Sequence, residues 1–252
     1  MNHFRSKAIL AALLFLFVSG LRADEAATLF NDANKLFEQG KFSEASIAYE
    51  KLIDSGSISA PVYFNSGNAF YKSGQLGRAI AAYRSAEKLS PRDPDVRANL
   101  RFVRDQAGGA TRSATRWENP IGRLTLDEWT IVTATAMSLW FLLLAFRQFR
   151  FGSRKSFRGG LIILGLASIA LVLCLGAAIR QEILGKSAVV TVPEAVVRRG
   201  PLEESQSAFT LRDGAEISVI DQKGDWLHIV DAAKRTGWLL QRQTVSIGKR
   251  NR

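Results

Sequence analysis

Residues 131–146, IVTATAMSLWFLLLAF, and residues 161–179, LIILGLASIALVLCLGAAI, decide the fold of this chain. They are separated by RQFRFGSRKSFRGG at 147–160, and neither run contains a charged residue. A helix needs about 20 apolar residues to cross about 30 Å of hydrocarbon. We therefore predict a membrane hairpin, with transmembrane helices at 127–147 and 160–180 joined by a loop at 148–159. The alternative is a pair of buried helices in a soluble protein, but such helices are usually shorter and carry a polar stripe.

Basic residues gather between the two apolar runs. These cations are Arg147, Arg150, Arg154, Lys155 and Arg158, and no acid accompanies them. Short loops rich in Lys and Arg stay in the cytoplasm, so both ends of the hairpin are expected to face away from it. The net charge of the chain is +11, but residues 24–108 hold 11 basic and 11 acidic residues. Most of the excess charge therefore serves membrane topology, and we expect no nucleic-acid partner.

The first 23 residues have the pattern of a secretory signal peptide. A basic start with Arg5 and Lys7 precedes an apolar run from Ala8 to Val18, and small residues lead to Ala23. This run is too short to span a membrane comfortably, so we predict a signal peptide at 1–23. An uncleaved anchor is the alternative, because Leu21 is bulky for a residue two positions before a cleavage site. Either outcome exports the segment that follows.

Residues 24–107 are predicted to be helical and contain an internal repeat. A shift of 34 residues aligns Asn34 with Asn68, Phe37 with Tyr71, Gly40 with Gly74, Ala45 with Ala79, and Tyr49 with Tyr83. This spacing and these residue types resemble the tetratricopeptide repeat, or TPR, family. We expect two repeats and a closing helix that begins at Pro94 after a cap at Asp93, followed by a linker at 108–126. So short a solenoid would benefit from a partner.

The TPR resemblance implies a groove for a protein partner along the first helix of each repeat. Amide side chains there could bind a peptide backbone, aromatic rings supply apolar area, and cations could hold a carboxylate. The alternative is that the aromatic residues simply pack the solenoid. Phe30 replaces the lysine of the family's carboxylate clamp, so we expect no specificity for a C-terminal peptide. The predicted partner-binding residues of the groove are Asn34, Phe37, Phe64, Asn68, Tyr71, Lys72 and Arg101, with Glu38 and Arg97 beside them.

Beyond Gly185 the sequence changes to short β-branched runs that predict five or six strands in a small barrel at 186–247. This segment resembles bacterial SH3-like domains, with an Arg199-Gly200-Pro201 turn and a closing Gly237-Trp238 pair. Gly214 and Gly237 are expected to permit tight turns between strands. Trp226 could be a core residue, which we favour, or could line a peptide groove.

No constellation of catalytic residues emerges from the sequence. The histidines are His3 and His228, and the one cysteine, Cys174, lies in an apolar run, so neither a disulfide nor a Cys/His metal site is expected. No glycine-rich phosphate loop follows a strand, and no serine or cysteine nucleophile lies beside His228. We therefore expect a protein that binds other molecules, without enzymatic activity, cofactor or metal.

The fold class is a multidomain membrane protein with an all-α TPR solenoid, a two-helix hairpin and an all-β SH3-like barrel. The order signal peptide, TPRs, hairpin and barrel resembles the BatE proteins of Bacteroides-type aerotolerance (Bat) operons. The resemblance implies a periplasm-facing scaffold in the bacterial inner membrane that binds Bat proteins with von Willebrand A domains and serves stress tolerance. The alternative function is a cell-wall sensor or targeting factor whose barrel binds peptidoglycan.

Overall fold

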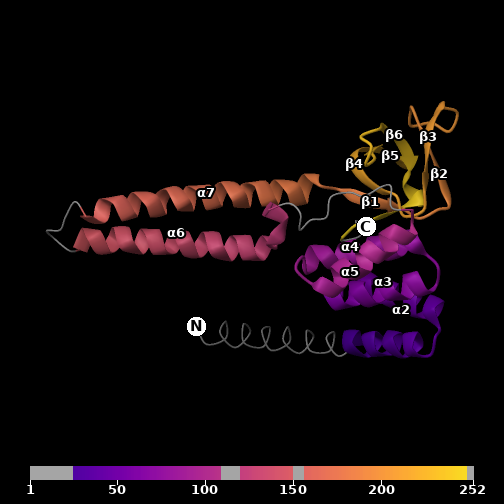
Figure 1. The fold of residues 1–252 in the computed structure, drawn as a ribbon, viewed down its shortest axis with the longest axis horizontal. Helices are drawn as coiled ribbons and strands as arrows, with labels where there is room; N and C mark the ends of the chain where they lie inside the picture. Colours follow the sequence, from indigo (N-terminus) through magenta and orange to yellow (C-terminus); the bar gives the residue numbers. More distant parts are fainter. Residues whose placement is uncertain (1–24, 109–119, 150–155, 249–252) are drawn as a thin grey trace, which may run out of the picture.

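The computed structural model describes residues 25–108, 120–149 and 156–248. The predicted signal peptide, most of the predicted linker and the middle of the basic loop lie outside these residues. The described chain forms a helical part, a long helical hairpin and a β-barrel (Figure 1). The predicted fold class, a TPR-like solenoid followed by two apolar helices and an all-β domain, is confirmed.

The helical part consists of five antiparallel helices in sequence. They span residues 25–38, α2 Phe42–Asp54, α3 Ala60–Lys72, α4 Leu76–Leu89 and α5 Pro94–Gln106. Gly40 and Gly74 follow the first helix of each repeat with φ of 76° and 79°, a left-handed conformation that glycine adopts without steric cost. The Asp93 carboxylate accepts hydrogen bonds from the N–H groups of Asp95 and Val96, so the predicted cap of α5 is confirmed.

The hairpin is formed by α6 Leu126–Phe149 and α7 Ser156–Leu184, after a short 3₁₀ turn, η2 Pro120–Arg123. Both helices extend past the predicted spans of 127–147 and 160–180. They contain apolar stretches of 22 and 25 residues, long enough to cross a membrane. Within an apolar window of 18 residues in each stretch, only 11% and 17% of the residues are buried by protein. The alternative of two buried core helices therefore does not describe them. Large apolar side chains face outward along both helices, including Ile131, Leu139, Leu142, Phe146, Ile162, Ile163, Leu166, Ile169 and Leu173.

The barrel contains seven antiparallel strands in the order β3-β2-β6-β5-β4-β1-β7. Their bounds are β1 Ser187–Val190, β2 Glu194–Arg198, β3 Ser207–Arg212, β4 Glu216–Lys223, β5 Trp226–Val230, β6 Thr236–Leu240 and β7 Thr244–Ser246. The barrel thus has one or two strands more than the five or six expected. The predicted turn at Gly214 is confirmed, since this residue lies between β3 and β4 with a φ of 84°. The barrel interior is filled by Val190, Val197, Leu211, Ile217, Leu227, Ile229 and Leu239.

The prediction that Gly237 lies in a turn is wrong. Gly237 lies within β6, opposite Ile229 of β5. A Cβ at this position would lie 2.5 Å from Val197 Cγ1 and 2.8 Å from the Arg198 carbonyl oxygen. Glycine occupies this position because β2 lies too close to the β6 backbone to leave room for a side chain. Turn geometry is not the reason.

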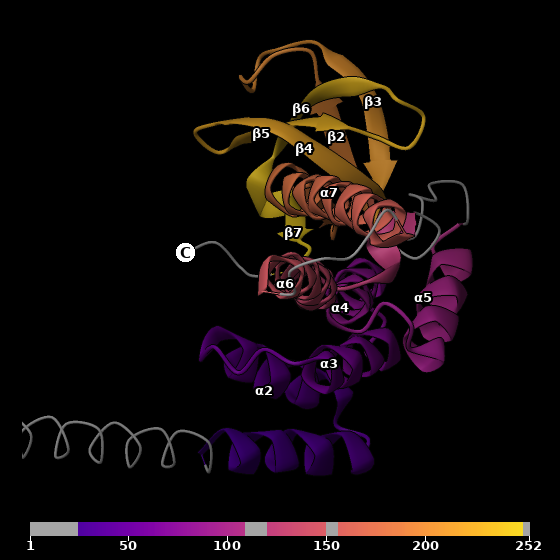
Figure 2. The same cartoon turned by 90° about the vertical axis from the view of Figure 1, so that its left-hand side faces the viewer.

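The barrel packs directly against the last helices of the solenoid (Figures 1 and 2). Ile80 of α4 and Val103 of α5 share one buried cluster with Val189 of β1 and Ile247, which follows β7. In a third TPR, a second helix would pack on α4 and α5. Here β1 and β7 cover that surface, so the partner that the short solenoid needed is the chain's own barrel.

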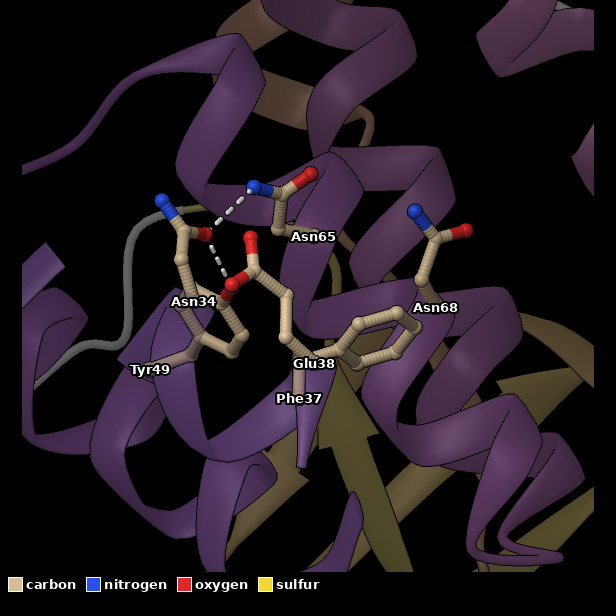
Figure 3. A pocket seen from close by; sticks show the side chains of 6 residues that line it. All are labelled: Asn34, Phe37, Glu38, Tyr49, Asn65 and Asn68. Atoms are coloured by element: carbon tan, nitrogen blue, oxygen red, sulfur yellow. Dashed lines mark hydrogen bonds between the residues drawn. The ribbon is translucent and has the colours of Figure 1, made fainter. Parts of the chain in front are cut away.

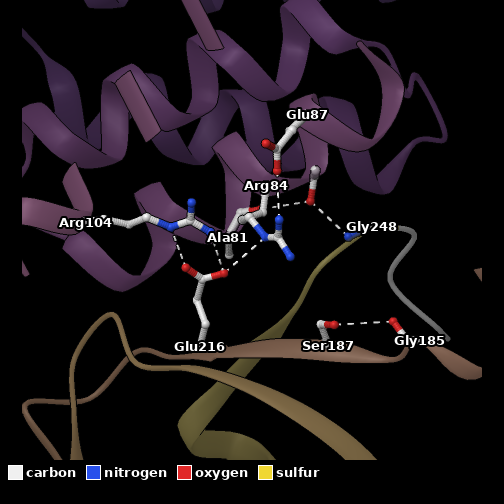
Figure 4. Close-up of polar contacts among 9 residues, drawn as sticks. Ala81, Arg84, Glu87, Arg104, Gly185, Ser187, Glu216 and Gly248 are labelled. Atoms are coloured by element: carbon white, nitrogen blue, oxygen red, sulfur yellow. Dashed lines mark hydrogen bonds and ion pairs between the residues drawn. The ribbon is translucent and has the colours of Figure 1, made fainter. Parts of the chain in front are cut away.

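A buried ionic cluster crosses the same interface (Figure 4). Glu216 of β4 accepts hydrogen bonds from Arg104 Nε at 2.5 Å and Arg104 Nη2 at 2.8 Å. Arg84 Nε of α4 lies 3.1 Å from the Glu216 carboxylate, in an ion pair that is not aligned as a hydrogen bond. Arg84 also donates from Nη1 to Glu87 at 2.8 Å. Glu216, Glu87 and Arg104 are all buried, which makes the cluster sensitive to loss of any one charge.

Two hydrogen bonds from backbone N–H groups also join the solenoid to the barrel segment, and two ion pairs join it to the hairpin. Gly77 N–H donates to Asp213 Oδ1, and Gly248 N–H donates to Ser85 Oγ. Burial raises the pKa of the Asp213 carboxyl, although hydrogen bonds from backbone N–H groups oppose the rise. The hairpin ends are held by ion pairs of Lys88 with Glu182 and of Arg92 with Glu128. Both open ends of the hairpin therefore lie beside the solenoid.

Candidate functional site

A pocket of about 390 Å³ opens on the inner face of the solenoid, between the helix at 25–38 and α3 (Figure 3). Successive first helices of a TPR array line such a face, because each repeat stacks on the next with a small rotation. Three amides, two aromatic rings and one carboxylate surround the pocket. The lining residues are Asn34, Phe37, Glu38, Tyr49, Asn65 and Asn68.

A hydrogen-bonded ladder of asparagines and tyrosines builds the wall of this pocket. Asn34 Oδ1 accepts from the Tyr49 hydroxyl at 2.5 Å and from Asn65 Nδ2 at 3.0 Å. The same arrangement recurs one repeat later, where Asn68 Oδ1 accepts from the Tyr83 hydroxyl at 2.6 Å and from Asn99 Nδ2 at 3.2 Å. The short hydroxyl contacts are typical of O–H···O bonds, which fixes the orientation of the two amides.

The tyrosines of this ladder are buried donors. Burial raises the pKa of Tyr49 above its ordinary value, and nearby Glu38 adds to the rise although the Asn65 amide opposes it. Burial likewise raises the pKa of Tyr83. Both phenols therefore keep their protons at neutral pH and hold the asparagine oxygens in place.

These internal bonds limit how the amides of Asn34 and Asn68 can bind a peptide backbone. Their Oδ1 atoms each accept two internal hydrogen bonds, so their Nδ2 groups are the donors that remain for a partner. Asn65 presents its Oδ1 acceptor to the same pocket. Asn65 was missed in the sequence, although its 31-residue spacing from Asn34, repeated by Asn99 and Asn68, is a signal that could have identified it.

The predicted aromatic residues divide between groove and packing. Phe37 lines the pocket and packs edge-on against Phe42. Phe64 is half-buried against the core and lies 5.9 Å from the Tyr83 ring, so it supports the repeat junction. Tyr71 is half-buried and packs edge-on at 5.5 Å against Phe102, which is 50% exposed.

Three charged residues predicted for the groove have different surroundings. Lys72 and Arg101 are exposed, and no ion pair joins either to another described residue. Arg97 is directed to the main chain and donates to the carbonyl oxygens of Asp93 and Arg92. Among the six residues that line the pocket, Glu38 is the one with a formally charged side chain, a carboxylate.

Trp226 lies on the outer face of the barrel, which contradicts the preference for a core residue. Alternation along β5 buries Leu227 and Ile229 and leaves Trp226 and His228 half-exposed. His228 stacks on Trp238 of β6 with ring centroids 4.7 Å apart and planes 14° from parallel. Together these rings form an aromatic surface across two strands. His228 and Trp238 were not predicted as site residues, since stacking depends on strand register.

The described residues contain no group of three His, Cys, Asp or Glu side chains that could hold a metal ion. Cys174 is a free, half-buried thiol in α7.

Comparison with known families covers parts of the chain. No curated protein is similar enough to count as a match. The sequence model of the TPR repeat family matches residues 67–103, which include most of the second repeat and α5. The model of the bacterial SH3 domain matches residues 191–245, which include β2 to β6 and most of β7. The chain thus contains a TPR repeat and a bacterial SH3 domain, two modules that point to binding of protein partners.

Proposed function

We propose that this protein is a non-enzymatic scaffold of the bacterial inner membrane whose TPR and SH3-like domains bind envelope proteins on the periplasmic side. The observation that carries the proposal is the pocket on the inner face of the solenoid, with unused amide donors beside aromatic rings. An extended protein segment needs such donors for its carbonyl groups and apolar surface for its side chains.

The packing of the barrel on the solenoid supports a two-span hairpin. Domains that share a buried cluster must lie on the same side of any membrane that the intervening chain crosses, and two spans return the chain to that side. The basic loop favours a cytoplasmic location for the opposite end. A Cys174→Ala chain with a single cysteine at Ser153 or Ser218 tests this orientation. An impermeant maleimide should label intact spheroplasts at 218 but not at 153, and the reverse pattern would refute the proposal.

The partners that we propose are membrane proteins with von Willebrand A domains, acting together in a Bat-type complex linked to aerotolerance. The support is the order of modules, from a predicted signal peptide through TPRs and hairpin to the barrel. This order resembles the BatE family.

Site-specific photocrosslinking tests the partner and the groove together. A photoreactive phenylalanine analogue replaces Lys72, which repeat alignment assigns to the groove face, or Ile47, which is 53% exposed on α2 and outside the pocket. Irradiation of native membranes should give adducts with a von Willebrand A protein from position 72 only. Equal adducts from both positions, or adducts with no membrane protein, would contradict the groove assignment.

A second candidate function is peptidoglycan binding through the outer face of the barrel. The favouring observation is the stacked His228–Trp238 pair beside Trp226, because sugar rings and peptide stems pack well on flat aromatic surfaces. The full chain in nanodiscs should sediment with purified cell wall, and His228→Ala should reduce the bound fraction. Leu202→Ala, an exposed change elsewhere on the barrel, should leave it unchanged. Equal retention of both variants would argue against this surface.

A further inference from the structure

The pocket in the solenoid contains an acidic group that no other described residue neutralises. Glu38 lies at the end of the first helix and makes neither a hydrogen bond nor an ion pair with the described residues. The nearest cation along the helix, Lys35, pairs instead with Asp32 at 3.5 Å. Glu38 is itself exposed, but it lines a concave site, whose walls focus the field of a carboxylate and attract cations.

The other groups around Glu38 also suit a cation. Asn65 Oδ1 is a free acceptor because its Nδ2 is the atom that donates to Asn34. The rings of Phe37 and Tyr49 line the same space, and aromatic faces attract Lys and Arg side chains. An acidic side chain would instead be repelled by Glu38, and a purely apolar one would leave the carboxylate and the amide without partners.

Amide donors adjoin this cation-binding corner. Asn34 and Asn68 line the same pocket, and their Nδ2 groups, which the internal bonds of Oδ1 leave unused, are donors suited to the carbonyl oxygens of an extended peptide. We propose that the pocket binds a lysine or arginine side chain of an extended segment of a protein partner. This inference rests on the proposed function of the groove and specifies the chemistry of its occupant.

Comparison of the two repeats also predicts the direction in which a bound segment runs along the groove. The position equivalent to Glu38 in the second repeat, 34 residues later, is Lys72, which is exposed. Repeat alignment therefore places an acid on the groove face of the first repeat and a base at the equivalent position of the second. A bound segment should place its basic residue toward the first repeat, which fixes the direction in which the partner chain runs.

Peptide selection with the full chain in nanodiscs tests the inference. Random dodecapeptides displayed on phage are selected on the unmodified chain and on Glu38→Gln, Glu38→Lys and Glu44→Gln variants. Glu44 is an exposed acid in the first turn of α2 that does not line the pocket, so its variant is the matched control. Circular dichroism checks that each variant keeps its helical signal.

The unmodified chain and Glu44→Gln should select peptides with Lys or Arg at one fixed position. The preference should disappear with Glu38→Gln and change to Asp or Glu with Glu38→Lys. For a synthetic peptide with the selected sequence, Glu38→Gln should weaken binding about tenfold, as expected for loss of one charge-assisted hydrogen bond. Replacing the peptide lysine by glutamine should give the same loss, and the two changes together should not add.

Two outcomes would overturn the inference and are distinguishable. Peptides that bind the groove without a basic preference, or an equal effect of Glu38→Gln and Glu44→Gln, would refute the cation pocket while the groove function stands. Failure of every variant to select any peptide would refute the groove function and the inference together.

Discussion

Removal of the Glu216 carboxylate should uncouple the barrel from the solenoid. In Glu216→Ala the Arg104 guanidinium loses contacts at 2.5 and 2.8 Å, and Arg84 loses its contact at 3.1 Å. Arg84 keeps Glu87 as a partner, but Arg104, with only 9% of its side chain exposed, is left as an unpaired buried cation. Breaking such a pair from one side costs about 3–5 kcal/mol. We expect the free energy of unfolding to fall by about that amount.

Urea denaturation of the full chain in detergent micelles, followed by circular dichroism at 222 nm, measures this effect. The matched control is Glu203→Ala, which removes an exposed pair of the same type, with Glu203 and Arg242 3.9 Å apart and 75% and 77% exposed. Exposed pairs of this kind contribute under about 1 kcal/mol. Because Arg104→Met also removes the stranded cation, Glu216→Ala with Arg104→Met should be more stable than Glu216→Ala alone. An equal effect of Glu216→Ala and Glu203→Ala, or no recovery in the double variant, would refute the reasoning.

Three further expectations concern the barrel, the interface and the groove wall. Gly237→Ala should destabilise the chain by about 1–3 kcal/mol in the same denaturation assay, because the added Cβ would lie 2.5 Å from Val197 Cγ1. Asp213→Asn should stabilise the folded chain at pH 7, because burial raises the pKa of Asp213 and disfavours its charged form in the folded state. The gain in stability should vanish below pH 3.8, where Asp213 is protonated in both the folded and the unfolded chain. A pH-independent gain would contradict this cause. Burial also raises the pKa of Tyr83 above 10.0, so stability should decline as pH rises beyond that value, and less steeply in Tyr83→Phe.

Features set by short-range pattern could be predicted from the sequence. The repeat spacing located Gly40 and Gly74, because a helix end that needs a left-handed residue is specified within a few positions. The lack of charge in the two apolar runs likewise fixed the long helices α6 and α7. These properties depend on neighbours along the chain and not on tertiary contacts.

Features that depend on distant contacts could not be predicted. Arg104 and Glu216 are 112 residues apart, and nothing in either segment specifies that they pair. The sequence also does not determine whether Trp226 faces the barrel interior or solvent. Alternation in β5 places Trp226 and His228 on one face of the strand but does not say which face is buried. In the structure Leu227 and Ile229 face the interior, where their aliphatic side chains fill the narrow barrel.

The sequence could place residues on the groove face but could not show how their polar atoms are used. Asn34 and Asn68 do lie along it, but internal bonds from Tyr49 and Tyr83 take up their oxygens. Repeat alignment locates residues on a face, while the use of each polar atom depends on partners from neighbouring helices.

The docking of the barrel on α4 and α5 has a consequence for how the protein is made. Ribosomes release the solenoid first, and the strands that cover Ile80 and Val103 follow only after both hairpin helices have been synthesised. Until then, the last helices expose an apolar surface to chaperones and proteases. If the hairpin spans the membrane as proposed, completion of the solenoid would report that both spans have been inserted, and chains with a misplaced span would carry an unfinished, degradable domain.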